Sequence, residues 1–165
     1  MEIRDIEAFL DYYGKLRART RRVIGCIPQE HLEWTYREGK FTLGDLVRHL
    51  ATIERWLYAE TVAGRPPAYQ GAGSELAAGY SHPIELMDEL HHQSMEIFSR
   101  LTPEDLAQKV QTPEGTPITC WKWLRAMTEH EIHHRGQIYL YLNILGVKTP
   151  PLFGLTAEEL RDRSV

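Results

Sequence analysis

The sequence predicts an all-α protein that folds as one four-helix bundle, and three observations support this prediction. Four long stretches place apolar residues at helical spacing, each stretch ends at a helix-breaking residue or turn, and none is apolar on every side. A chain of 165 residues is also long enough to bury one substantial hydrophobic core. We therefore expect a single domain over residues 1–165, in which each long helix turns one apolar face inward.

The first two long helices are predicted over residues 5–26 and 42–63. The first stops before Pro28, and its apolar residues recur about every 3.6 positions: they are Ile6, Phe9, Leu10, Tyr13, Leu16 and Val23. The second opens at Thr42, whose hydroxyl can cap the helix while Asp45 completes a capping-box-like pair. It ends at Gly64, directly before Arg65 and two prolines.

Three more helices are predicted over residues 82–101, 120–145 and 157–163, the last of them short. Residues 65–80 are rich in Gly, Ala and Pro, which indicates a crossover loop long enough to run along the side of a bundle. Thr102 begins another short helix, and residues 109–119 surround a Pro-Glu-Gly turn that allows a small hairpin or an ordered loop. Gly146 and Thr156 have the chemistry of a helix C-terminal cap and a helix N-terminal cap.

The composition argues against two classes of partner. The net charge is −4, from 19 basic and 23 acidic residues, and no large basic face for nucleic acid is evident. The arginines between Arg17 and Arg22 are expected on a solvated helix face. No window is apolar enough to span a membrane, and the N-terminus lacks the pattern of a signal peptide. We expect a cytoplasmic protein with Cys26 and Cys120 as small buried residues and no disulfide.

The most informative feature is a pair of histidines on the last long helix. His130 and His134 are four residues apart, so their side chains lie above one another in the middle of the apolar stripe. Burying two imidazoles is costly unless their nitrogens find partners, and bonds from neutral imidazole to a metal ion provide them. A hydrogen-bonded core network is the alternative.

Two ligands do not complete a metal site, because transition metals in catalytic sites usually take three protein ligands. Periodicity leaves His49 and His91 as the better candidates and favours His49 only slightly. The string from His130 to His134 also matches HExxH, the pattern of zinc proteases in which Glu131 would be the general base. The extended metzincin pattern is missing, however, and no strand is evident to hold a peptide, so a protease is the weaker alternative.

The segments LxxHLATIExW and HxxxHRGQIYxYLxxLG, joined by a long crossover and followed by a Pro-rich exit, resemble the DinB/YfiT superfamily of metal-binding four-helix bundles. The resemblance implies that His49 joins His130 and His134 to hold one divalent metal. It also implies an up-down-down-up topology and a homodimer. His133 departs from the pattern as an additional imidazole beside the site, and we expect it to be exposed.

The resemblance further implies a thiol S-transferase or a hydrolase-like enzyme that acts on a small electrophile. The cofactors would be one divalent transition metal, zinc or nickel, and in the transferase a low-molecular-weight thiol. Possible wall residues around a small-molecule substrate are Gln137, Tyr141, Trp56 and Glu54. The alternative is a non-enzymatic, stress-related metal-binding or interaction protein. This non-enzymatic alternative would be favoured if a fourth protein ligand, from Glu54, Glu131 or His133, closed the metal's coordination.

Overall fold

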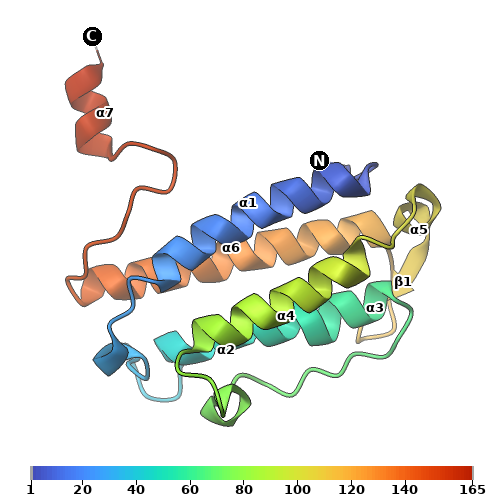
Figure 1. Ribbon diagram of the computed structural model, residues 1–165, viewed down its shortest axis with the longest axis horizontal. Coiled ribbons are helices and arrows are strands. Elements are labelled where there is room, and N and C mark those ends of the chain that lie inside the picture. Colours follow the sequence, from blue (N-terminus) through green and yellow to red (C-terminus); the bar gives the residue numbers. More distant parts are fainter. Residues whose placement is uncertain (1, 165) are drawn as a thin grey trace.

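The computed structural model describes residues 2–164 and has four long helical segments (Figure 1). These are α1 (Ile6–Ile24), α2 (Leu43–Ile53) with its continuation through η2 (Glu54–Ala59) and α3 (Glu60–Val62), α4 (Pro83–Phe98) and α6 (Cys120–Ile144). The prediction of a helical bundle is therefore confirmed, with helix ends that differ from the predicted ones by at most three residues.

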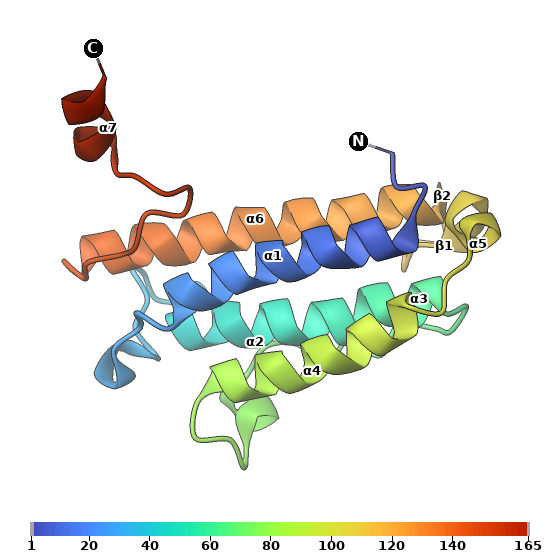
Figure 2. The same cartoon turned by 45° about the horizontal axis from the view of Figure 1, so that its top comes forward.

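The directions of the helices explain the long second connection. Figures 1 and 2 show α2 running antiparallel to α1, α4 running in the same direction as α2, and α6 returning antiparallel to both beside α1. Two parallel neighbours cannot be joined by a tight turn, so the chain between α3 and α4 travels back along the bundle. This return includes the short 3-10 helix η3 (Ser74–Ala77). A second 3-10 helix, η1 (Gln29–His31), lies between α1 and α2.

The local signals for helix starts and for a hairpin are confirmed. Thr42, Thr102 and Thr156 each form a capping box, at the start of α2, α5 (Pro103–Ala107) and α7 (Ala157–Arg163). Strands β1 (Lys109–Gln111) and β2 (Pro117–Thr119) pair antiparallel and form a small hairpin directly before α6. No helix of the described residues is long and apolar enough to cross a membrane.

The apolar periodicity of the second long helix predicted a continuous α-helix, but the structure interrupts it. Residues Glu54–Ala59 form a π-helical segment, with wider i to i+5 hydrogen bonding, between α2 and α3. Such segments shift the faces of the helix on either side of them. Directly after the segment, Thr61 on α3 contacts α6: the indole Nε1 of Trp123 donates a hydrogen bond of 2.7 Å to Thr61 Oγ1.

A layer of charged side chains divides the hydrophobic core into two clusters. One cluster includes Leu50, Met87 and Leu142, and the other includes Phe9, Phe98 and Leu124. Along each long helix the charged or polar members of the layer fall between residues of the two clusters. These members are Arg17, Glu54, His91 and Glu131, and the hydroxyl of Tyr13 reaches the layer from the cluster that contains Phe9.

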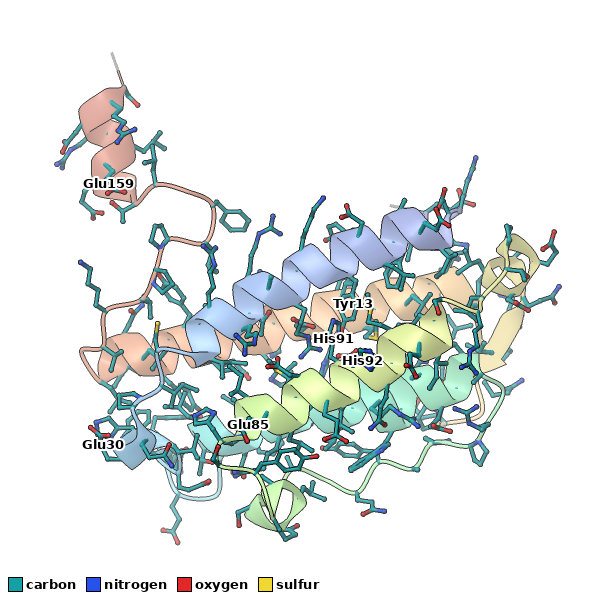
Figure 3. All side chains as sticks on the ribbon, viewed as in Figure 1. Tyr13, Glu30, Glu85, His91, His92 and Glu159 are labelled. Atoms are coloured by element: carbon teal, nitrogen blue, oxygen red, sulfur yellow. The ribbon has the colours of Figure 1, made fainter. Side chains whose placement is uncertain are left out.

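Arg17 is the centre of this layer, and its predicted place on a solvated face is wrong. Its side chain is 4% exposed, and its guanidinium forms ion pairs with Glu54 and, at 3.0 Å, with Glu131. His91 Nδ1 lies 2.9 Å from Glu54 Oε1, and Arg17 Nη2 donates to the Tyr13 hydroxyl at 3.0 Å. Figure 3 shows Tyr13 and His91 between α1 and α4. Every long helix thus contributes one or more polar groups to the centre of the bundle.

Two further features lie outside the core. Cys26 is half-buried rather than buried, while Cys120 is buried as predicted, and both thiols are free. The C-terminal segment with α7 stands away from the bundle (Figures 1 and 2), and none of the residues of α7 is buried. The bundle is therefore complete without α7.

Candidate metal centre

The three histidines of the candidate centre come from α2 and α6. His49 lies two turns into α2, whose start is fixed by the reciprocal hydrogen bonds between Thr42 and Asp45. His130 and His134 occupy successive turns in the middle of α6. His49 is buried, and the other two are half-buried. Because all three positions belong to long helices packed on the core, the backbone holds the rings in place.

Their ring nitrogens converge. His130 Nε2 lies 3.1 Å from His49 Nε2 and 3.0 Å from His134 Nε2, and one nitrogen of each ring lies within 4.8 Å of those of the others. In a tetrahedral site with metal–nitrogen bonds of about 2.0–2.1 Å, ligand nitrogens are separated by about 3.3 Å. The three nitrogens are thus spaced as the ligands of a single small cation would be.

The opposite ring nitrogens of two histidines have their own hydrogen-bond partners. His49 Nδ1 lies 2.7 Å from the Tyr69 hydroxyl, and His134 Nδ1 lies 2.7 Å from Gln137 Oε1. An amide oxygen can only accept, so His134 Nδ1 carries the proton and its Nε2 presents a lone pair. With Tyr69 accepting from His49 in the same way, His130 could donate to only one of the two facing lone pairs. A divalent cation satisfies all of them, and outer hydrogen bonds of this kind orient metal-ligating histidines.

The surroundings keep the imidazoles neutral. Burial, together with the neighbouring His134, lowers the pKa of His49 to about 4. Burial and the three other histidines nearby lower the pKa of His130 to about 3, and burial also lowers that of His134. Metal ions bind deprotonated imidazole, so these nitrogens are available as ligands at neutral pH.

Small-molecule sites typically have volumes of about 300–1,000 Å³. A cavity of about 620 Å³ adjoins the candidate centre at His134. His134 and Gln137 line it, as does Tyr141, while Phe41 places its ring centroid 5.3 Å from that of His49. The remaining lining residues come from the loop before α2, from α2 and from the end of α6: Tyr36, Gly39, Lys40, Leu46, Leu140 and Ile144. The candidate centre therefore has protein on one side and an open cavity on the other.

The other residues considered from the sequence lie in different places. Gln137 and Tyr141 line the cavity, but Trp56 packs half-buried against the core and the Glu54 carboxylate is held by Arg17 and His91. His91 therefore bonds to a carboxylate and not to the histidine cluster. His133 is exposed, as expected.

Glu131 is not placed to act beside the histidines. Its side chain is 1% exposed, and Oε2 pairs with Arg17 at 3.0 Å on the α1 side of α6. The general base of an HExxH protease must instead reach a water next to the metal. This geometry removes the support for the protease alternative, and it leaves no fourth protein ligand among Glu54, Glu131 and His133.

Tyr69 and Phe41 were missed from the sequence. Tyr69 lies in the crossover between α3 and α4, and Phe41 lies in the loop before α2. Loop residues have no periodicity from which their direction could be inferred, so only the folded chain brings them to the site.

A bundle of four helices in which three imidazoles from two helices converge beside an open cavity defines a class of helical proteins with a candidate mononuclear metal site. The family comparison agrees with this description. The chain belongs to the DinB superfamily, whose family model matches residues 12–138.

Several relatives from bacilli are similar to this chain. YjoA from Bacillus subtilis is 24% identical over 137 residues, covering 81% of this chain and 86% of YjoA. The crystal structure of YjoA, described as DinB-like, superposes with a TM-score of 0.71 over 88% of this chain and 98% of that one, at 20% identity. YfiT from Bacillus subtilis, described as a probable metal-dependent hydrolase with an unusual four-helix bundle topology, superposes with a TM-score of 0.67 at 18% identity, covering 90% and 91% of the two chains. At these identities the structures establish the shared fold.

Proposed function

We propose that this protein is an enzyme that uses one divalent transition metal, held by His49, His130 and His134, to transfer a nucleophile to a small electrophilic substrate. The observation that carries the proposal is the convergence of three Nε2 atoms beside a cavity, with no fourth protein ligand grouped with them among residues 2–164. Three ligands and an open position are the pattern of catalytic rather than structural sites. The name of YfiT, a probable metal-dependent hydrolase, supports hydrolysis as the reaction.

The roles of the chain's own residues follow from their positions. Tyr69 and Gln137 hold the proton on Nδ1 of His49 and His134 and so keep Nε2 free as a ligand. Tyr141 and Phe41 cover the approach to the histidines with aromatic surface, which excludes water from part of the site. A divalent ion held by His49, His130 and His134, zinc or nickel, would supply Lewis acidity to the substrate and would lower the pKa of the attacking nucleophile.

The nucleophile is water in a hydrolase and a low-molecular-weight thiol in an S-transferase. The cavity has room for either arrangement, and the same three ligands serve both. The non-enzymatic alternative, a metal-binding stress protein, is disfavoured by the open side of the site.

Metal content is the first test. Elemental analysis of untagged protein purified without chelator should find about one transition metal ion per chain. The variant His134→Ala loses one of three ligands and should lose most of that metal. The control is His133→Ala, which removes a neighbouring imidazole that is exposed and outside the cluster, and which should keep the metal. Equal metal contents in all three proteins would overturn the proposed ligand set.

Activity then separates the two reactions. The metal-loaded protein is incubated with small activated esters and amides and with alkyl halides, with and without a thiol. Turnover of esters or amides without thiol identifies a hydrolase, and consumption of the halide only with thiol identifies an S-transferase. Absence of both from a fully metal-loaded protein would favour the non-enzymatic alternative.

A further inference from the structure

The chemistry of the cavity beside His134 indicates which kind of molecule fits it. Its walls are apolar: three aromatic rings, from Tyr36, Phe41 and Tyr141, and three aliphatic side chains, from Leu46, Leu140 and Ile144. Besides the histidine, the polar groups of its described lining are the amide of Gln137, whose oxygen is engaged by His134, the hydroxyls of Tyr36 and Tyr141, and the ammonium of Lys40. A molecule with several charged or hydroxyl groups, such as a sugar, would find too few partners on such walls.

These apolar side chains are exposed to an unusual degree for their size. Tyr36, Phe41, Leu140 and Ile144 are 55%, 41%, 56% and 57% exposed, and all four border this one cavity. Isolated apolar residues on a surface are ordinary, whereas several gathered around a cavity mark a binding site. The edge-on packing of Tyr36 on Tyr141, with ring centroids 5.5 Å apart, keeps two of these rings at the wall.

Lys40 gives the cavity one fixed charge. It follows Gly39, whose φ of 75° turns the loop back toward α2, and it lines the cavity opposite no carboxylate. Glu33 of the loop and Asp45 of α2 are both bonded to Arg48 instead. Glu38, the other acidic residue of this loop, is exposed and is not among the residues that line the cavity. Among residues 2–164, no carboxylate forms an ion pair with the Lys40 ammonium.

We propose that the substrate of this site is a small organic acid with an apolar body, whose hydrocarbon or ring portion lies against the cavity walls and whose acidic group pairs with Lys40. The inference rests on the proposed function only in placing the reacting bond near His134. Lys40 is then a residue that determines specificity, and the preference for an acid is a property of the cavity itself.

The test uses three probes with the same apolar body, which are 4-phenylbutyrate, 4-phenylbutan-1-ol and 4-phenylbutylamine. Isothermal titration calorimetry at low ionic strength should show the acid binding roughly threefold to fivefold more tightly than the alcohol, as a partly exposed ion pair contributes. The amine should bind more weakly than the alcohol. Added salt should reduce the preference for the acid, because salt screens exposed charges.

Two variants locate that preference. In Lys40→Met the acid and the alcohol should bind equally. The control is Lys122→Met, the same change at a lysine in the first turn of α6, and there the preference for the acid should persist. In Phe41→Ala all three probes should weaken together, since the wall and not the charge is altered. Equal binding of acid and alcohol to the wild type, or no binding of any probe because a second copy covers the cavity, would overturn the proposal.

Metal-loaded and chelator-treated protein are titrated side by side, because a carboxylate can also bind a metal directly. If Lys40 is responsible, the preference for the acid survives removal of the metal. If it survives in Lys40→Met and disappears on chelation, the acid binds the metal and the assignment of Lys40 is wrong. A protein that contains no metal would defeat the proposed function, yet the ratio of acid to alcohol affinity would still test Lys40.

Discussion

Tyr69 shows how a single loop residue can matter to a site built on helices. Its hydroxyl is the only partner of His49 Nδ1 among the described residues, at 2.7 Å. The variant Tyr69→Phe should weaken metal binding about tenfold, because partners that orient a ligating histidine typically change affinity by that order. Competition with a chromophoric chelator measures the effect. Tyr80→Phe, in the same crossover but bonded to Glu89, should bind metal like the wild type.

Glu54 gives the buried charged layer a pH dependence. Burial alone would raise its pKa, but Arg17 and His91 outweigh burial and hold the pKa of Glu54 below its ordinary value. A carboxyl whose pKa is lower in the folded than in the unfolded state stabilises the fold above its unfolded pKa, and this contribution is lost as the pH falls through the folded value.

We therefore expect the free energy of unfolding of the wild type to fall as the pH is lowered below about 4.5, the ordinary range for a glutamate. The same fall should be shallower in Glu54→Gln, which has no proton to gain there. Urea titrations between neutral pH and about pH 3 measure both slopes. The exposed residue Glu30 provides the control, since Glu30→Gln should keep the slope of the wild type.

Among the elements, α2 depends on its N-terminal cap, Thr42. Thr42 and Asp45 exchange hydrogen bonds of 2.9 Å in both directions, at the start of the helix that carries His49 and much of the core. The variant Thr42→Ala should lower the free energy of unfolding by about 1 kcal/mol. Thr156→Ala removes the same motif from α7, which has no buried residue, and should leave global unfolding unchanged. Equal effects of the two variants would mean that α7 unfolds together with the bundle.

The elements could be predicted where local chemistry decides them. The capping threonines, the breakers after each helix and the i, i+4 spacing of His130 and His134 are local signals, and the structure confirms the helices that they mark. Arg17 and the π-helical segment could not be predicted in the same way. Whether an arginine is buried depends on carboxylates that arrive from two other helices, and a π turn depends on packing that no periodicity of residue types records.

On the scale of the whole molecule, the bundle should not need its C-terminal segment. No residue of α7 is buried, and Phe153 before it is 81% exposed. Deleting residues 154–165 should shift the melting temperature by less than about 2 °C, as expected for a change at the surface of a domain of this size. The replacement Phe98→Ala, at a side chain that is 0% exposed, should by contrast cost about 3–5 kcal/mol.

The full chain and the chain without residues 154–165 also test the homodimer that the family resemblance implies, which stays a prediction. Light scattering compares the mass of the full chain and of the shortened chain in solution. A melting temperature that drops well beyond 2 °C on deletion would show that the segment stabilises the bundle or an assembly of it.

The π-helical segment Glu54–Ala59 also has a consequence for how this chain is compared with others. A π turn closes over one more residue than an α turn, so residues after it are rotated by about 100° from the course of a simple α-helix. A relative whose second helix is α-helical throughout would align with this chain only if a one-residue gap were placed inside the helix. Without that gap, an alignment anchored on His49 would assign the partner of Trp123 to the neighbour of Thr61, and an alignment anchored on Thr61 would misplace the histidine.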